Sequence, residues 1–170
     1  STKKPLGLGN HADYPCQVSL VTVNDTGRAH RTYHLDERPH ARGVASIARF
    51  PRTDPADSTS VDFATGGIDG IVSHWHWRAR STRADTLRLH TLHDTKPVVA
   101  LEHLASRCHT LASASLGTVV GYDLAALTLG WSWNTSDRIV HLQRTPDAKL
   151  MLGVLARRDY DQFRMFDVTG

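Results

Sequence analysis

The sequence predicts an all-β protein built from repeated units, and three observations support that prediction. Three segments of the chain resemble one another at a spacing of about 45 residues, a period typical of repeat architectures. Each segment contains short apolar or alternating stretches separated by turn residues, which is the pattern of β-strands. No segment shows the 3.6-residue periodicity of an amphipathic helix.

The composition is that of an ordinary soluble globular protein, with 40% hydrophobic and 22% charged residues in a chain of 170. The net charge of +3 is too small to indicate a nucleic-acid-binding protein by itself. No stretch approaches the roughly 20 apolar residues that a membrane-spanning helix needs. Cys16 and Cys108 lack the close-spaced partners of a disulfide framework or a zinc site, so we expect a reducing intracellular location, nuclear or cytoplasmic.

The repeated units align on a closing aromatic residue. The first unit covers 40–51 and 63–75, the second covers 93–101 and 111–123, and the third covers 137–142, 146–154 and 163–167. Their closing residues are Trp75, Tyr122 and Phe166, which follow one another at intervals of 47 and 44 positions. Asp69 and Gly70 separate two strand-like stretches of the first unit, which predicts a hairpin there.

The first unit carries the most complete pattern. His40 is followed by Val-x-x-Ile-x-x-Phe-Pro, then by Ala-Thr-Gly-Gly, then by Asp69 and Gly70, and the unit closes on Trp75. This order of residues resembles the WD-repeat (WD40) family, and the resemblance covers about residues 15–170. It implies a partial WD40-type β-propeller, with about three and a half four-stranded antiparallel blades of a larger ring. In such a ring the strands a to d of each blade run outward from a central channel.

The resemblance also implies where the strands lie. In the first full blade they fall near 44–50, 61–67, 71–77 and 86–93. Residues 17–23 and 28–35 would end a preceding blade, with 6–10 in an earlier strand, and Trp131-Ser-Trp133 falls in the outermost strand of the next full blade. We therefore expect blades over 1–39, 40–93, 94–136 and 137–170, the first and last of them partial. Because a ring needs about four to eight blades, we expect a longer chain or a second copy to supply the rest.

His40, Thr65 and Asp69 together look like a base, a nucleophile and a carboxylate. In the WD-repeat family the matching residues form, with a Trp at the position of Trp75, a buried hydrogen-bonded chain. That chain holds the loop between blades against the turn between strands b and c. Buried networks of this kind are satisfied and rigid. We therefore interpret these four residues as a structural network and not as a catalytic site.

The second unit has an incomplete version of the same set. His93, Ser113 and Tyr122 occupy the matching positions, but Leu116 stands where the first unit has Asp69. The substitution removes the carboxylate that would orient the histidine. We therefore expect the second blade to be looser than the first.

No other pattern in the chain predicts chemistry. His74 and His76 share one face of a strand, but the sequence shows no Cys or carboxylate at ligand spacing. There is no Gly-rich phosphate loop between a strand and a helix, and no Gly-x-Ser-x-Gly elbow. We therefore predict no enzyme activity, no cofactor and no metal site.

Ligands of a propeller usually bind to loops at one rim, since the strands serve to hold those loops. The predicted rim consists of residues from the loops between strands d and a and between strands b and c. They are Arg38, Arg42, Ile68, Asp94, Lys96, Leu116, Arg138, Arg157 and Arg158. Six of these nine are basic. Such a rim favours an acidic peptide, a phosphorylated segment or a nucleic-acid backbone, and a solvated face without a ligand is the alternative.

The predicted function is a protein-interaction scaffold in an intracellular multiprotein complex. A chromatin or nucleic-acid contact module is the alternative from a different class. The run Trp75-His76-Trp77-Arg78 is similar to the Trp-Asp-x-Arg pattern by which WD-repeat substrate receptors dock on the adaptor of cullin-4 ubiquitin ligases, with His76 in place of the Asp. This similarity implies that Arg78 is a candidate adaptor contact.

Overall fold

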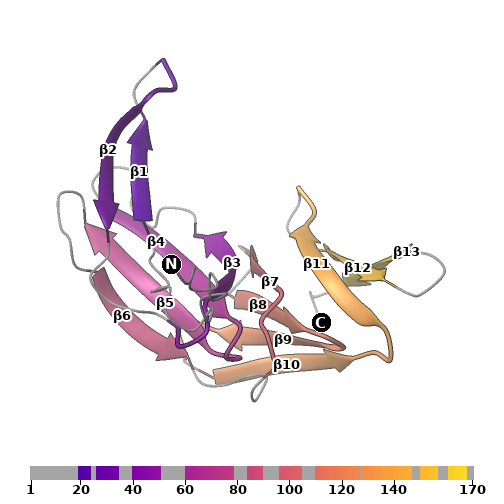
Figure 1. The fold of residues 1–170 in the computed structure, drawn as a ribbon. Coiled ribbons are helices and arrows are strands. Elements are labelled where there is room, and N and C mark those ends of the chain that lie inside the picture. Colours follow the sequence, from indigo (N-terminus) through magenta and orange to yellow (C-terminus); the bar gives the residue numbers. More distant parts are fainter. Residues whose placement is uncertain are drawn as a thin grey trace, which may run out of the picture.

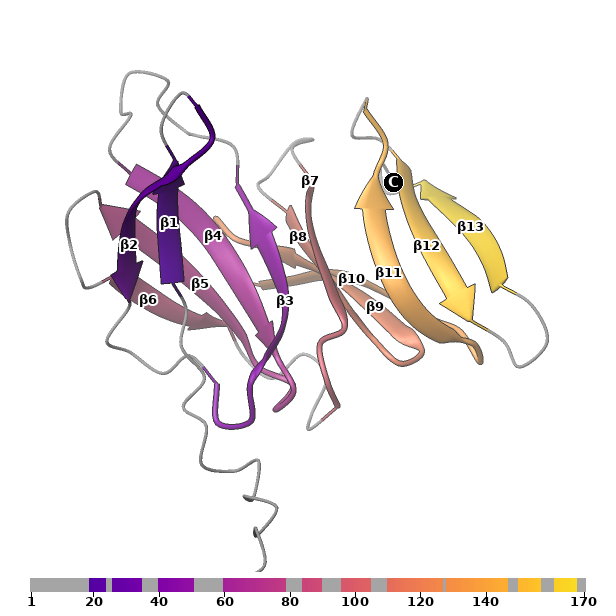
Figure 2. The ribbon, with the colours of Figure 1, turned by 45° about the horizontal axis from the view of Figure 1, so that its top comes forward.

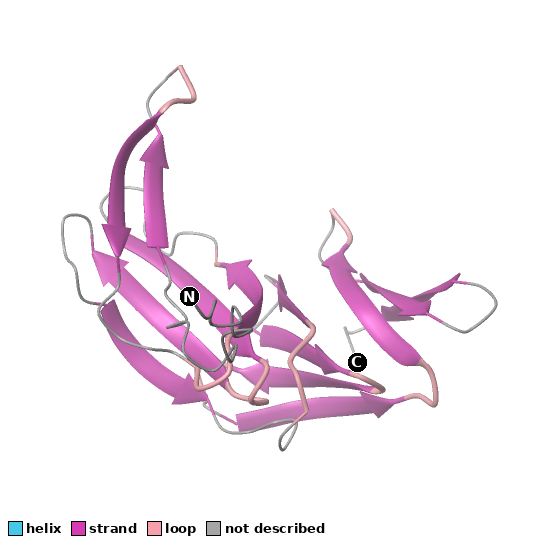
Figure 3. Cartoon of the chain, in the orientation of Figure 1, coloured by secondary structure: helices cyan, strands magenta, loops and turns pink. Residues whose placement is uncertain are grey.

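The computed structural model describes residues 19–23, 26–34, 40–50, 60–78, 84–89, 96–104, 110–126, 128–146, 150–156 and 161–167. Every regular element within these ranges is a β-strand (Figure 3). The same ranges contain no helix, so none in them is long and apolar enough to cross a membrane. The prediction of an all-β fold is confirmed.

Each sheet consists of strands that are consecutive in the sequence and paired antiparallel. A two-stranded sheet contains β1 (Ser19–Val23) and β2 (Ala29–His34). The first four-stranded sheet has the order β3 (Val44–Arg49), β4 (Ser60–Gly67), β5 (Val72–Arg78) and β6 (Ala84–Leu89). The second has the order β7 (Ala100–Leu104), β8 (Thr110–Ser115), β9 (Thr118–Asp123) and β10 (Thr128–Asn134). A three-stranded sheet contains β11 (Arg138–Arg144), β12 (Leu150–Ala156) and β13 (Asp161–Asp167).

The sheets follow one another around an arc in the order of the chain (Figure 1, Figure 2). The first strands of the last three sheets are neighbours, because β3 contacts β7 and β7 contacts β11. The remaining strands of each sheet extend away from this inner line, and β6 and β10 form the outer edges of the two four-stranded sheets. This is the arrangement of antiparallel blades that the repeat predicts.

The strands also lie close to their predicted positions. Residues 44–50, 61–67 and 71–77 correspond to β3, β4 and β5, while 17–23 and 28–35 correspond to β1 and β2. The fourth strand of the first full blade begins earlier than expected, because β6 includes residues 84 and 85. Residues 90–93 of the expected strand lie outside the described residues. The strand expected at 6–10 lies outside the described residues.

Apolar side chains fill the spaces between successive sheets. Val72 and Leu111 are fully buried in a cluster that joins the two four-stranded sheets, together with Phe50 and Tyr122. A second cluster joins the second four-stranded sheet to the three-stranded sheet. Its buried members are Ala100, Leu104, Ala114, Val119, Ile139 and Leu142. Each sheet therefore buries an apolar face against its neighbour, which is how repeated units of this kind are stabilised.

Strand alternation decides which side chain enters which cluster. In β7, Leu101 packs toward the first four-stranded sheet, whereas Ala100 and Leu104 pack toward the three-stranded sheet. Neighbouring residues of a strand point to opposite faces of its sheet. An inner strand between two other sheets therefore needs apolar residues on both faces, and this explains the almost continuous apolar run at 97–101.

The first four-stranded sheet has a second apolar face, directed away from the other four-stranded sheet. Phe63, Trp75 and Trp77 are buried there, with Val44 and Val61 packed against them. The rings of Phe63 and Trp75 are stacked, with centroids 5.9 Å apart and planes 6° from parallel. These two residues lie opposite each other in the ladder between β4 and β5, so the pair fixes the register of the two strands.

Candidate functional site

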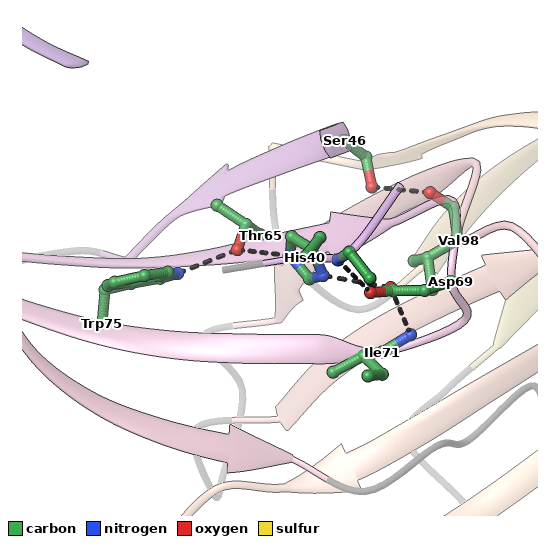
Figure 4. A network of polar contacts seen from close by, with 8 residues as sticks. His40, Ser46, Thr65, Asp69, Ile71, Trp75 and Val98 are labelled. Atoms are coloured by element: carbon green, nitrogen blue, oxygen red, sulfur yellow. Dashed lines mark hydrogen bonds and ion pairs between the residues drawn. The ribbon is translucent and has the colours of Figure 1, made fainter. Parts of the chain in front are cut away.

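The turn between β4 and β5 is held to the loop that precedes β3 by the side chain of Asp69. Its carboxylate accepts hydrogen bonds from the backbone N–H of Ala41 at 2.9 Å and of Ile71 at 3.2 Å. Oδ1 of the same carboxylate lies 3.1 Å from Nδ1 of His40 (Figure 4). Gly70 completes the turn with φ +79°, a conformation that glycine adopts without strain.

The polar contacts continue inward from His40. Its Nε2 lies 2.9 Å from Oγ1 of Thr65, and the indole N–H of Trp75 donates to the same oxygen at 2.8 Å. His40, Thr65 and Trp75 are all buried. An imidazole with its proton on Nδ1 fits every contact, because it donates to Asp69 and accepts from the Thr65 hydroxyl. The structure thus brings together the four residues that the sequence singled out.

This arrangement has little capacity for chemistry. The Thr65 hydroxyl is fully buried and is engaged by two neighbours, so it is not presented to a substrate. The network connects the loop before β3, the turn after β4, and the interior of the sheet. We therefore keep the interpretation that its role is structural.

The equivalent turn of the second four-stranded sheet is held differently. Leu116 lies between β8 and β9 with φ +38°, and no other non-glycine residue of the described ranges has a positive φ. Its carbonyl oxygen accepts a hydrogen bond from the backbone N–H of Ile139 at 2.7 Å. This main-chain bond links the turn to the next sheet, as the bond from the N–H of Val98 to the carbonyl of Gly67 does for the first sheet. The difference lies in the side chain, because Leu116 stands where the first sheet has the carboxylate of Asp69.

The polar set predicted for the second unit, His93, Ser113 and Tyr122, lies only partly within the described residues. Tyr122 is buried in the cluster between the two four-stranded sheets. His93 and the side chain of Ser113 lie outside the described part of the structure. The expectation of a looser second blade therefore stays a prediction.

Five of the nine predicted rim residues are described, and all five are exposed. They are Arg42, Ile68, Lys96, Leu116 and Arg138. Arg38, Asp94, Arg157 and Arg158 lie outside the described residues. Two carboxylates near this rim are instead drawn inward: the side chain of Asp69 is 11% exposed, and Asp137 is 9% exposed. The described part of the rim therefore presents cations and apolar side chains to the solvent.

The two exposed apolar residues of the rim, Ile68 and Leu116, are each hydrogen-bonded through the backbone to a segment with a basic residue. The N–H of Ile68 donates to the carbonyl of Gly43 at 3.0 Å, one residue after Arg42 in the loop before β3 of the same sheet. The N–H of Ile139, one residue after Arg138 at the start of β11 in the next sheet, donates to the carbonyl of Leu116. An apolar turn residue therefore lies near a basic residue twice on the rim.

A carboxylate beside the paired histidines is a feature that the sequence analysis missed. Asp62 lies directly opposite His76 in the ladder between β4 and β5. Its Oδ1 is 2.7 Å from Nδ1 of His76 and 3.9 Å from Nε2 of His74. The spacing of residues in the sequence did not reveal this carboxylate, because strand pairing brings together residues 14 positions apart. A group of three or more His, Cys, Asp or Glu residues suited to a metal ion is not found within the described ranges.

Burial changes the acidity of two groups near these interfaces. The pKa of His74 is lowered by burial, and the neighbouring His76 lowers it further while Asp62 opposes the change. The pKa of Glu102 is raised by burial, against the opposing effects of Arg144 and His141. The Arg144 Nε lies 3.6 Å from Oε1 of Glu102, so this ion pair bridges β7 and β11.

The candidate adaptor contact, Arg78, is exposed at the end of β5. His76, which stands in place of the family's Asp, is engaged by Asp62. The docking role of Arg78 stays a prediction.

No family model matches the sequence, and no curated protein matches it. Solved structures do match. The crystal structure of the mitotic checkpoint complex aligns with a TM-score of 0.57 and 18% identity, covering 83% of this chain and 39% of that chain. BBS1N in complex with ARL6DN aligns with a TM-score of 0.56 and 17% identity, covering 88% of this chain and 41% of that chain. The β-propeller domain of Myceliophteria thermophila Cps50 (Swd1) aligns with a TM-score of 0.49 and 22% identity, covering 64% of this chain and 32% of that chain.

These neighbours are β-propeller proteins. The first two alignments, together with the radial antiparallel sheets, show that the chain has a β-propeller fold. The chain spans about two fifths of the length of the two chains that it matches with TM-scores above 0.5. At these identities the similarity concerns the fold.

Proposed function

We propose that this chain is a non-enzymatic protein-interaction scaffold of an intracellular multiprotein complex, and that its rim binds an acidic segment of a partner. One observation carries the proposal. The described rim exposes Arg42, Lys96 and Arg138 beside the apolar tips Ile68 and Leu116, while Asp69 and Asp137 are turned inward. The titles of two structural neighbours also name protein complexes.

The geometry of the rim suits a peptide. Ile68 and Leu116 lie in turns of neighbouring sheets, and the backbone of each turn is hydrogen-bonded next to Arg42 or Arg138. Residues two apart in an extended chain share a face. An extended partner whose every second residue is acidic and apolar in turn could therefore place these side chains beside the cationic and apolar residues of the rim. Guanidinium and carboxylate groups form charge-assisted hydrogen bonds, which are stronger than neutral ones.

The rim is also held in place before any partner arrives. Hydrogen bonds from Ala41, Ile68 and Ile139 hold the two loops and the two turns together. A surface that is already ordered loses less conformational entropy on binding. The lower entropy cost favours binding of a short partner segment through a small contact area on the rim.

The proposal is tested by fluorescence anisotropy with a labelled ten-residue Glu-Leu peptide, in which Glu and Leu follow each other in turn at every second position and serine fills the positions between them. We expect saturable binding that weakens as salt increases. The variant carrying Arg42→Glu and Arg138→Glu should bind at least about tenfold more weakly, corresponding to about 1.4 kcal/mol. Arg28→Glu is the matched control, because Arg28 is exposed in the turn between β1 and β2 and should leave binding unchanged.

Two outcomes would reject the proposal. One is peptide binding that survives the double charge reversal. The other is tighter binding to a 20-base-pair DNA duplex than to the peptide, with a steep loss of affinity as salt increases. That second result would favour the alternative of a chromatin or nucleic-acid contact module.

The adaptor-docking role of Arg78 is a finer proposal with a separate test. Arg78 lies on a strand end and not among the rim residues, so Arg78→Ala should leave peptide binding intact. Co-purification with the cullin-4 adaptor that is lost in Arg78→Ala would support docking, and no co-purification of the unaltered chain would reject it.

A further inference from the structure

The outer edge of β10 has the properties of a strand that can pair with another strand. β10 is the last strand of its sheet, and no other described strand pairs with its outer side. Figure 1 shows β10 along the margin of the sheet, beyond β9. An outer strand remains accessible even when further blades complete the ring, because blades stack through their faces.

The side chains of β10 lack the usual protection against edge pairing. Proteins protect exposed edges with charged residues or proline. The seven residues of β10, Thr-Leu-Gly-Trp-Ser-Trp-Asn, include neither. The irregularity at Gly130, of a kind that can also protect an edge, lies outside the regular ladder from Trp131 to Asn134. The edge strands that end the other described sheets do carry charges: Arg31 in β2, Asp85 and Arg88 in β6, and Asp161, Arg164 and Asp167 in β13.

The side chains around the centre of β10 are at least partly accessible. Ser132 and Asn134 are exposed, and Trp131 and Trp133 are half-buried on the other face, where they pack against the second apolar cluster. The Trp131 indole lies directly over Gly121, in the space that a Cβ there would occupy. The tryptophans are therefore held in place on the sheet.

The sequence of β10 is self-complementary for antiparallel pairing. Gly130 has no partner in β9, because the register passes from Leu129 to Trp131, and the regular ladder then runs from Trp131 to Asn134. A twofold axis at Ser132 would place Trp131 of each copy directly opposite Trp133 of the other. Cross-strand aromatic pairs stabilise an antiparallel ladder, and two serines meeting at the axis bring no charge repulsion.

We propose that β10 is a homotypic interface, at which a second copy of this chain pairs antiparallel with β10 about a twofold axis at Ser132. A symmetric contact of this kind closes on itself and yields a dimer rather than a filament. The partner at β10 is thus a second copy of this chain, whereas the partner proposed for the rim is an acidic segment of another protein.

Site-directed crosslinking tests the register. In a chain with Cys16→Ser and Cys108→Ser, the variant Ser132→Cys places two thiols opposite each other, with Cα atoms about 4.5 to 5.5 Å apart. That separation suits a disulfide. Thr128→Cys is the matched control: it is exposed on the same strand, but its copy would lie about 27 Å away. We expect covalent dimers under mild oxidation from Ser132→Cys and at least tenfold fewer from Thr128→Cys.

Charge variants test the same axis by sedimentation over a concentration series. Ser132→Lys places two like charges together and should weaken dimerisation about fivefold, as should Ser132→Glu. An equal mixture of the two should restore association, because lysine then faces glutamate. Equal crosslinking of the two cysteine variants, or an unaltered chain that is monomeric throughout the concentration series, would overturn the proposal.

Discussion

At the scale of single residues, Asp69 shows how one side chain joins two segments. Its two carboxylate oxygens contact His40 and the backbone N–H groups of Ala41 and Ile71. Leu116 occupies the matching turn of the next sheet and supplies no carboxylate. Both turns are joined to the following sheet by a main-chain hydrogen bond, from Val98 to Gly67 and from Ile139 to Leu116. The contacts of Asp69 are therefore an addition that the second sheet lacks.

The Asp69→Ala variant tests the contribution of this carboxylate. We expect a loss of about 1 to 3 kcal/mol in the free energy of unfolding, because His40 and two backbone N–H groups lose their acceptor. Urea denaturation followed by circular dichroism measures it. Asp123→Ala is the control, since Asp123 also accepts from two backbone N–H groups, but in an exposed turn. Equal losses in the two variants, or an unchanged melting temperature for Asp69→Ala, would contradict the structural role.

At the scale of elements, the turn between β8 and β9 contains a residue that stability alone does not favour. Leu116 has a positive φ, which suits glycine or asparagine, and its apolar side chain is 38% exposed. The exposed side chain is not buried in the core, so core packing does not account for this conformation. We expect the side chain to contact the partner proposed for the rim.

The Leu116→Gly variant separates stability from binding. Glycine adopts the positive φ freely, so the free energy of unfolding should be unchanged or rise by up to about 1 kcal/mol. Binding of the Glu-Leu peptide should weaken, because one apolar tip of the rim is lost. Denaturation and anisotropy on the same samples measure both quantities. A variant that is destabilised and binds normally would show that the leucine serves the fold.

At the scale of the whole molecule, stability depends on contacts between sheets. Phe50 lies between His74 of the first four-stranded sheet and His103 of the second, with ring centroids 5.0 and 4.7 Å away. His103 is 3% exposed. Protonation of His74 would therefore place a positive charge at the boundary between the two four-stranded sheets.

This boundary predicts a pH dependence of stability. Because burial lowers the pKa of His74 in the folded protein, the unfolded chain takes up its proton first as the pH falls below 6.5. The His74 contribution is thus present above pH 6.5 and is lost as the pH falls toward the lower folded value. We expect His74→Gln to lose less stability than the unaltered chain between pH 7 and pH 5. Parallel pH profiles in urea denaturation would show that His74 is not responsible.

The sequence by itself determined the strands, their order and the repeat, because these depend on local patterns. Alternating side chains and turns such as Asp69-Gly70 act over a few residues, so β3, β4 and β5 lie close to their expected positions. The members of the His40 network could also be named, since the first unit resembles the motif of the WD-repeat family. The fold class therefore required no knowledge of contacts between distant residues.

Only the tertiary structure decided which groups meet across strands and which reach the solvent. Asp62 and His76 come together through the register of β4 and β5, and Asp69 and Asp137 turn inward although they lie near a basic rim. The outer edge of β10, with which no described strand pairs, likewise follows from the order of strands in its sheet. Register and sheet packing are set by many distant contacts at once, and no short stretch of sequence contains that information.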